Sequence, residues 1–321
     1  DNKDLMTNNK ALAQNYYDKE GNVRHVDTGR WPNASVTVSP RVGFVWDVLG
    51  DKSLKVRGGT GLFSGRLPLV FFTNMPTNGG LVQYAAQINA ANAKNMGYSM
   101  DTFKGGLVTD ANGKATIDAL LQKLIGLGYP STVKPEDGAL PSAINGVDPK
   151  FKMPQVWKTS LAIDYAFPTS FPLSASVEGI YNKTINGVSI SDWSIMPVEG
   201  FSRFNGADNR PIYPSSGYRT GTKAFVLENT SKGYGYSGVF TLNAQPVESL
   251  SLSASYTHTV SKEITGMPGS AAESAFTYVP TSEGPNNIKL HNSQYVTPDR
   301  IVASATHHDK AGNHFSLIYE T

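Results

Sequence analysis

The six histidines are the residues best suited to binding a metal ion, and their positions argue against a zinc site. No two of them stand in the His-x-x-x-His or His-Glu-x-x-His spacing that places two imidazoles on one helix face. His307 and His308 are adjacent, but they flank an expected turn, and a turn position explains them without a metal. We therefore expect that the chain holds no metal ion.

Two other motifs are similar to ligand-binding loops but lack the required context. Residues 110–113 read Asp-Ala-Asn-Gly, as in a calcium loop, yet the acidic fifth position and the distal glutamate of an EF-hand are missing. A Gly-x-Gly-x-x-Gly pattern occurs at Gly233, Gly235 and Gly238, inside an alternating strand pattern with no helix after it. A dinucleotide site requires a strand, a turn and a helix around these glycines. We expect neither site.

The sequence contains no motif for nucleophilic catalysis or for binding nucleotide phosphates. Neither a Gly-x-Ser-x-Gly elbow nor a P-loop is present. Acidic residues such as Asp164 and Glu178 are scattered over expected strands, and their spacing supports no acid–base pair. We expect that the chain is not an enzyme and carries no cofactor.

The composition of the 321 residues favours strands and excludes several classes of protein. The net charge of +2 gives no reason to expect a nucleic-acid partner. Charged residues make up 17%, below the roughly 25% of an ordinary soluble domain, while glycine (31) and tyrosine (15) are frequent. Cysteine is absent, which excludes disulfides and thiolate metal sites. No apolar run reaches the roughly 18 residues of a transmembrane helix, but a membrane barrel needs only alternating strands of about 9–11 residues.

Residues 39–64 contain the clearest alternation of side-chain types and predict a hairpin. Val42, Phe44 and Trp46 alternate with polar or small residues, and the pattern resumes after a turn at Gly50–Asp51. A period of two places one set of side chains on each face of a strand. One face of this hairpin is therefore apolar and the other charged. Such a hairpin suits a soluble sandwich, or a membrane barrel with its apolar face toward lipid and its charged face toward a wet lumen.

Three further hairpins show the same alternation. They pair residues 157–165 with 173–181, 234–242 with 250–256, and 301–307 with 315–319. The four expected turns are short and lie near residues 49–53, 167–172, 245–249 and 309–313, whereas the connections between hairpins, 65–154, 182–223 and 261–298, are long. Alternate connections of a meander lie at the same end, so one end carries only short turns and the other only long loops. This asymmetry is typical of bacterial outer-membrane barrels.

The polar faces of these strands supply one set of candidate site residues. In a barrel they line the lumen, where they contact a plug domain, the wall itself or a passing solute. The lumen-facing candidates are Arg41, Asp47, Lys55, Arg57, Lys158, Asp164 and Glu178.

The long loops supply a second set of candidates and one expected helix. Residues 116–125 have helical spacing and end at Gly126. Loop aromatics either stack on a ligand or pack the loops against one another. These candidates for ligand contact are Trp193, Phe201, Phe204, Tyr213 and Tyr218.

Aromatic residues near the strand ends indicate two membrane interfaces. Trp157 and Tyr165 lie roughly 26 Å apart along one strand, which after tilting nearly covers an apolar band of about 25 Å. Trp46 and Phe315 lie near the short turns. Tyrosine and tryptophan are also good strand residues in any sheet, but their positions here favour two aromatic girdles.

Five segments together resemble the barrel of TonB-dependent receptors, and most closely the Oar-like group of Bacteroidetes, whose members contain a carboxypeptidase regulatory domain. They read RWPNASVTVSPRVGFVWDV (30–48), DKSLKVRGGTGLFSGR (51–66), NTSKGYGYSGVFTL (229–242), LSASYTHTVSK (252–262) and PDRIVASA (298–305). The matches cover about half of the chain and agree with the hairpins derived from alternation. The long loops match nothing specific.

The resemblance implies an all-β fold: an antiparallel transmembrane β-barrel, part of a 22-stranded barrel, with long extracellular loops of which one contains a short helix. It implies an outer-membrane transporter of a Gram-negative bacterium that imports a peptide, a glycan or a metal chelate. The bilayer and the TonB complex are the implied partners, the latter through regions outside this chain, and a surface lipoprotein is a further candidate. The chain starts with polar residues and stops within an alternating strand, so we expect residues 1–321 to be a barrel fragment without the plug domain.

Two other functions remain open at this point. The first is a non-transporting outer-membrane barrel that acts in adhesion or structure. The second is a soluble β-sandwich binding module, which would bury Trp46, Leu161 and Phe240. No nucleic-acid partner is expected for any of the three.

Overall fold

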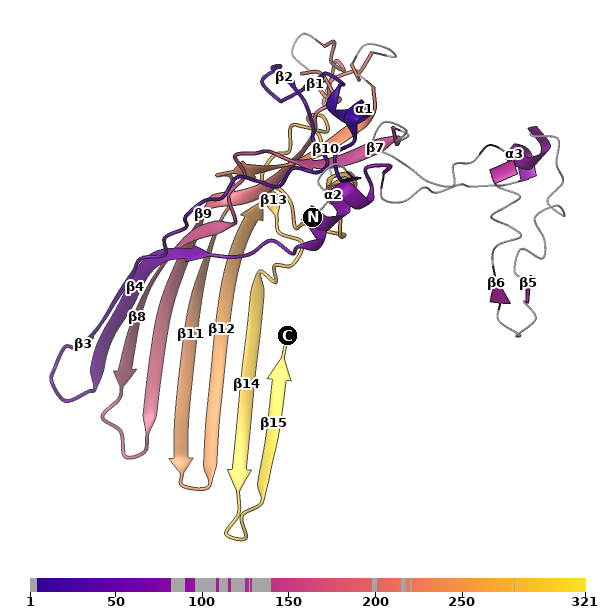
Figure 1. The fold of residues 1–321 in the computed structure, drawn as a ribbon. Helices are drawn as coiled ribbons and strands as arrows, with labels where there is room; N and C mark the ends of the chain where they lie inside the picture. Colours follow the sequence, from indigo (N-terminus) through magenta and orange to yellow (C-terminus); the bar gives the residue numbers. More distant parts are fainter. Residues whose placement is uncertain are drawn as a thin grey trace.

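The computed structural model describes residues 5–81, 90–95, 108–109, 115–116, 125–126, 128, 140–197, 201–214, 218–219, 221–279 and 281–321. Its main feature is an antiparallel meander of eight strands, in which each strand pairs with its neighbours along the path (Figure 1). The strands are β3 (Arg41–Asp47), β4 (Leu54–Ser64), β8 (Gln155–Ala166), β9 (Leu173–Asp192), β11 (Tyr234–Val247), β12 (Leu250–Glu263), β14 (Asp299–His308) and β15 (His314–Glu320). The predicted all-β, antiparallel fold is confirmed. The sheet is open, with β3 and β15 at its edges, and does not close into a barrel.

The two ends of the sheet differ as predicted. Four short turns lie together at one end, and the long connections leave from the other (Figure 1). Acidic side chains hold the turns: Asp47 accepts hydrogen bonds from the backbone amides of Gly50 and Lys52. Asp309 does the same for Ala311 and Asn313. Each aspartate replaces backbone partners that a tight turn cannot supply, which fixes the strand register beside it.

The strand register separates an apolar face from a polar one. Phe240 on β11 pairs with Tyr256 on β12, whereas the next residue, Thr241, pairs with Ser255. Phe240 is 46% exposed, Leu161 is 53% exposed and Trp46 is 60% exposed. The soluble sandwich required these three side chains to be buried. An exposed apolar face that runs across the whole sheet instead suits contact with lipid.

The second predicted loop starts later than expected, because β9 continues to Asp192. Its final residues pair with β10 (Lys223–Thr230), which also pairs in parallel with β7 (Ala143–Val147). β10 contains the continuous apolar run from Ala224 to Leu227 and is buried on both faces. A strand covered on both faces does not alternate, so the period-two pattern gave no sign of it.

Within the described residues, helices occur in two of the predicted loops, whereas one was predicted. α2 (Val70–Thr77) and α3 (Ala90–Asn95) lie within 65–154, and α5 (Ala272–Thr277) lies within 261–298. A helix was predicted over 116–125. Its last residue, Ile125, is helical, but its first, Thr116, lies in a strand, because β6 (Ala115–Thr116) pairs with β5 (Val108–Thr109). Residues 117–124 lie outside the described residues. No described helix has the length and apolar character needed to span a membrane.

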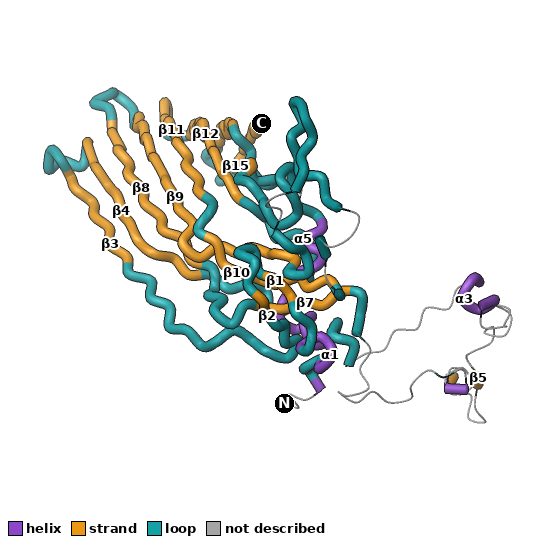
Figure 2. The backbone as a smooth tube through the Cα atoms, turned by 90° about the horizontal axis from the view of Figure 1, so that it is seen from above, coloured by secondary structure: helices purple, strands orange, loops and turns teal. Residues whose placement is uncertain are grey.

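The buried core lies beside the meander, at its loop-side end (Figure 2). It consists of three layers. The middle layer is the small sheet of β7, β10 and the end of β9. One face of it packs on α2 and α5 through Phe72, Leu227 and Ala275. The other face packs on the N-terminal segment, which contains α1 (Asn9–Leu12), β1 (Tyr16–Tyr17) and β2 (Val23–Arg24). We call these three layers the loop-side unit. In the eight meander strands, away from this unit, Ala162 is the one buried hydrophobic residue described.

The two faces of β11 provide a direct test of which side contacts lipid. Replacing Phe240 with Arg should weaken folding in lipid vesicles by about 2–4 kcal/mol, the cost of a cation facing the bilayer midplane. Replacing the adjacent Thr241 with Arg should cost only about 0.5 kcal/mol, because that side chain faces water. Urea unfolding followed by tryptophan fluorescence measures both. Equal costs for the two substitutions would contradict the assignment of faces.

Candidate functional site

Three of the seven lumen-facing candidates meet in one cluster on the polar face. The Nε of Arg57 on β4 lies 3.0 Å from a carboxylate oxygen of Asp164 on β8, and its Nη2 lies 3.1 Å from one of Glu178 on β9. Ser176 donates a hydrogen bond of 2.6 Å to Asp164. Arg57 and Glu178 are both register partners of Ala162, whose small side chain lets the guanidinium reach across β8. The cluster thus crosses three strands.

The cluster is a charge-balancing element rather than a reactive one. Arg57 is 41% exposed and Glu178 is 26% exposed, so water screens the attraction between them. Lys55 is the register partner of both Asp47 and Asp164, and it adds a second cation beside the two acids. The two carboxylates and the two cations balance one another across neighbouring strands. The cluster therefore suits a polar wall.

Two further candidates, Arg41 and Lys158, meet over an aromatic ring. The Arg41 guanidinium carbon lies 4.2 Å from the ring centroid of Phe63, and the Lys158 ammonium nitrogen lies 5.5 Å from it. Both cations are register partners of Gly61, on the polar face toward the loop end of β4. Among the residues that the structure describes, neither cation forms an ion pair. We call Arg41, Phe63 and Lys158 the basic cluster.

Part of this arrangement was visible in the sequence. Phe63 follows Lys55 by eight residues and Arg57 by six along β4, and because both separations are even, the three side chains lie on one face. On β9, Ser176 lies two residues before Glu178 and shares its face. Neither was singled out, because a period of two predicts a face but not a contact. Asp47, in contrast, was expected in the lumen and bonds the backbone of its own turn.

The loop candidates fall into two groups. Phe201, Tyr213 and Tyr218 pack together, with ring centroids 5.7 Å apart for the first pair and 5.1 Å for the second. Burial, and the neighbouring Tyr218, raise the pKa of the Tyr213 hydroxyl above its usual range. Phe204 is 50% exposed and free to contact a ligand. Trp193 is buried in the loop-side unit, so its role there is packing and hydrogen bonding.

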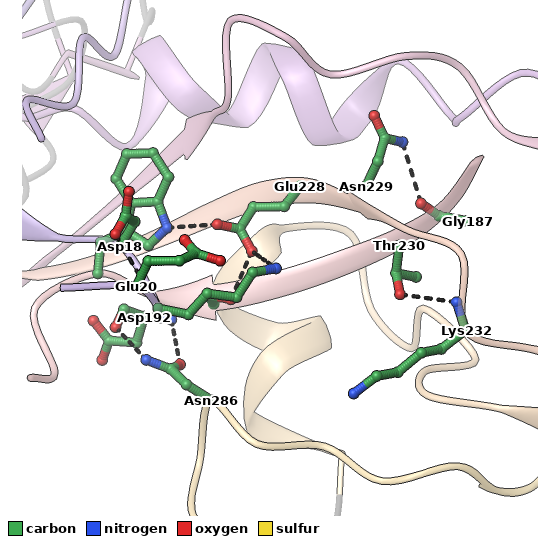
Figure 3. A network of polar contacts seen from close by, with 12 residues as sticks. Asp18, Glu20, Gly187, Asp192, Glu228, Asn229, Thr230, Lys232 and Asn286 are labelled. Atoms are coloured by element: carbon green, nitrogen blue, oxygen red, sulfur yellow. Dashed lines mark hydrogen bonds and ion pairs between the residues drawn. The ribbon is translucent and has the colours of Figure 1, made fainter. Parts of the chain in front are cut away.

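A buried polar network joins the layers of the loop-side unit (Figure 3). Glu228 on β10 accepts hydrogen bonds of 2.8 Å from the Trp193 indole and from the Ser191 hydroxyl, and Lys19 lies 3.4 Å from it. Asn286, in the third long connection, exchanges two hydrogen bonds with the backbone of Asp192. The N-terminal segment, the β9–β10 pair and the third connection are therefore fixed to one another.

The side chain of Asp192 belongs to the same buried network. It is fully buried, forms an ion pair with Arg219 and accepts a hydrogen bond of 2.6 Å from Ser194. A buried carboxylate is costly unless it is paired and hydrogen-bonded, and here both conditions are met. The network therefore holds the loop-side unit in one arrangement.

The sequence matches the family described as outer membrane beta barrel domain over residues 2–314. The chain belongs to this family. Its membership places the chain in the outer membrane of a Gram-negative bacterium, in contact with the lipid bilayer, and confirms the localisation predicted from the strands. The soluble sandwich is thereby excluded.

Other comparisons place the chain against single proteins. No curated protein matches the sequence. Among solved structures, the chain is similar to the outer membrane transporter YddB from Escherichia coli, with 12% sequence identity and a TM-score of 0.38. The similarity covers 87% of this chain and 28% of that transporter, so the chain spans little more than a quarter of its length.

The ion-pair cluster in this outer-membrane sheet predicts a measurable coupling across strands. A double-mutant cycle of Arg57→Gln and Glu178→Gln should give about 0.5–1 kcal/mol in low salt, as expected for partly exposed pairs. High salt should reduce this coupling by screening. The exposed pair Arg300–Glu320 is the matched control and should couple less strongly. Urea unfolding in vesicles measures both cycles, and zero coupling in low salt for Arg57 would contradict the structure.

The buried network predicts that Glu228 stabilises the loop-side unit. Glu228→Ala leaves the Trp193 indole and the Ser191 hydroxyl without their acceptor and should cost about 1–3 kcal/mol. Glu228→Gln keeps an acceptor oxygen and should cost less. Hydrogen exchange of the β10 amides reports the loss, and Glu248→Ala, at an exposed short turn, is the control. Unchanged protection in Glu228→Ala would show that the network does not hold β10.

Proposed function

We propose that the chain forms part of the barrel wall of a TonB-dependent receptor that imports a nutrient too large for passive diffusion. The segments that resemble TonB-dependent receptors of the Oar-like group of Bacteroidetes coincide with β3, β4, β11, β12 and β14. This agreement supports the finer family assignment. The candidate nutrients are a peptide, a glycan or a metal chelate.

The observation that carries the proposal is the charged inner face. The ion-pair cluster and the basic cluster follow one another along β4 and its neighbours, on the side opposite the lipid. Ion pairs such as Arg57 with Glu178 suit the polar lumen of any outer-membrane barrel. The basic cluster supports transport more directly, because in the described part of the chain its two cations have no acidic partner and can contact a plug domain or a solute. In this proposal the plug and the TonB-binding segment belong to regions outside this chain.

The remaining parts of the proposal concern partners and chemistry. A surface lipoprotein is a candidate partner for the loop-side unit, which lies at the end of the sheet that carries the long connections. We propose no catalytic activity, no cofactor and no nucleic-acid partner for the chain.

A second function, adhesion without transport, is favoured by one observation. Three loop aromatics are strongly exposed: Phe204 at 50%, Tyr278 at 69% and Tyr295 at 73%. Exposed aromatic rings suit binding to another surface. With this function, the barrel anchors the loops in the membrane and no solute passes through its lumen.

Growth of the native bacterium separates the two functions. A deletion strain should lose growth on one nutrient class when peptides, glycans and metal chelates are each supplied as a limiting source. Loss of TonB should reproduce the defect, and the intact gene on a plasmid should restore growth. Normal growth on all three classes, together with reduced attachment to surfaces, would overturn the import proposal and support adhesion.

A further inference from the structure

The lipid-facing side of the sheet carries two lysines at its loop end. Lys183 on β9 and Lys262 on β12 are both register partners of Tyr234 on β11, and Trp157 on β8 is the other register partner of Lys183. Trp157 lies four residues before Leu161, so the whole row shares the lipid-facing side. Aromatic and basic side chains therefore alternate across four neighbouring strands (Figure 1). We call Trp157, Lys183, Tyr234 and Lys262 the interface row.

Hydrogen bonds orient one lysine of this row without neutralising it. The ammonium group of Lys183 donates to the backbone carbonyl of Ser231 at 3.0 Å and to that of Gly233 at 3.4 Å, and both acceptors are uncharged. In the part of the chain that the structure describes, the ion pairs formed by lysines involve Lys19 and Lys289. Both lysines of the interface row therefore keep their positive charge.

The acidic residue on the same face of β14 lies apart from the row. Asp299 is the register partner of His258, which stands four residues before Lys262 on β12. Its carboxylate accepts a hydrogen bond of 2.6 Å from the Tyr256 hydroxyl and lies 2.8 Å from the His258 ring. Four residues of strand correspond to roughly 13 Å. The carboxylate is thus held by its own neighbours and not by the lysines.

The interface row stands where the apolar band of the sheet ends. Tyr181 and Tyr236, one step closer to the short turns, are exposed on the lipid-facing side, as expected for an aromatic girdle. The ammonium group of Lys183 reaches toward the carbonyls beyond the start of β11, as a lysine does when its stem lies on apolar surface and its charge seeks water. Long loops of outer-membrane barrels are extracellular. The two lysines therefore stand among the headgroups of the outer leaflet.

A shallow trough lies on the same face, closer to the short turns. Gly179 on β9 and Gly238 on β11 are register partners, and a Cβ at either position would meet no atom within 4 Å. The exposed rings of Tyr181 and Tyr236 border the trough on one side and that of Phe240 borders it on the other. An extended acyl chain can lie between such rims.

The spacing of the lysines and the trough matches one lipid molecule. Residues 179 and 183 lie roughly 13 Å apart along β9, whereas a headgroup layer is only about 5–8 Å thick. Even with the strand tilted by about 35–45°, the trough lies among acyl chains while the lysines lie among headgroups. Lys183 and Lys262 are two strands apart, roughly 10 Å at the backbone, so both side chains can reach one phosphate over Tyr234.

We propose that the interface row and the trough bind one phosphate-bearing lipid of the outer leaflet. Lys183 and Lys262 bind the phosphate, and an acyl chain lies over Gly179 and Gly238. Lysines attract anionic headgroups at a membrane surface, and the two glycines provide space that a neutral interface does not require. The site depends on the place of the chain in the outer membrane and is independent of whether the barrel imports a nutrient.

Tryptophan fluorescence in vesicles tests the proposal, because Trp157 belongs to the interface row. The full protein is placed in phosphatidylcholine vesicles that contain increasing fractions of phosphatidylglycerol with brominated acyl chains, which quench a tryptophan they touch. Brominated phosphatidylcholine is the neutral comparison, and the difference from Trp157→Phe isolates the signal of Trp157. At low ionic strength, the relative affinity at this position should favour the anionic lipid at least tenfold, and high salt should reduce the preference.

Substitution of the lysines should remove this preference. Lys183→Gln and Lys262→Gln should each lower it about fivefold, the loss expected for one lysine at an anionic surface, and the double variant should abolish it. The amide of Lys183→Gln still donates to the Ser231 carbonyl, so its loss reports the charge and not the fold. Inorganic phosphate should not displace the brominated lipid. Displacement would overturn the proposal and identify a site for free phosphate.

Lys310→Gln is the matched control, because it removes the same charge from an exposed short turn at the opposite end of the sheet. This variant should keep the lipid preference at Trp157 within about twofold of the unaltered protein. An equal loss in Lys310→Gln would show only a general attraction between the protein and anionic membranes. That result, or equal affinity of the two brominated lipids for the unaltered protein, would overturn the proposal.

Discussion

The structure depends on the need to pair every backbone amide and carbonyl group within a bilayer. Lipid supplies no hydrogen-bond partners, so a strand that crosses it must be bonded on both sides. Sequential hairpins meet this need along the path from β3 to β15, and aspartates such as Asp47 and Asp309 complete the turns between them. At β3 and β15 the sheet has open edges, and the same constraint requires strand partners there before the wall is closed.

That constraint explains which parts of the fold the sequence could predict. Where one face meets lipid and the other meets water, apolar and polar residues must alternate, so all eight meander strands were visible in the pattern. β10 was not, because the run from Ala224 to Leu227 is covered on both faces and shows no alternation. Its parallel partner β7 lies some 80 residues earlier in the chain, and local patterns carry no information about such a pairing.

The same distinction applies to the candidate site. The alternation of side chains along each strand predicted that Arg57, Asp164 and Glu178 lie on one face. Whether they contact one another depends on the strand register and on the small side chain of Ala162 between Arg57 and Glu178. Phe63 was not predicted as a site residue, because a single aromatic residue on a polar face does not by itself indicate a contact. Its contact with Arg41 is visible only in the structure. Trp193 was placed among ligand contacts, and its burial against Glu228 depends on chain segments far away in sequence.

One strand connects the wall to the loop-side unit. β9 carries Glu178 of the ion-pair cluster and, roughly 46 Å further along, Asp192 of the buried network. Between them the strand stays hydrogen-bonded, first to β8 and β11 and then to β10. A continuous paired strand is stiffer than a linker, so β9 fixes where the loop-side unit stands relative to the charged wall. In the proposed receptor, a solute bound by the loops would therefore meet the inner face at a position that the sheet determines.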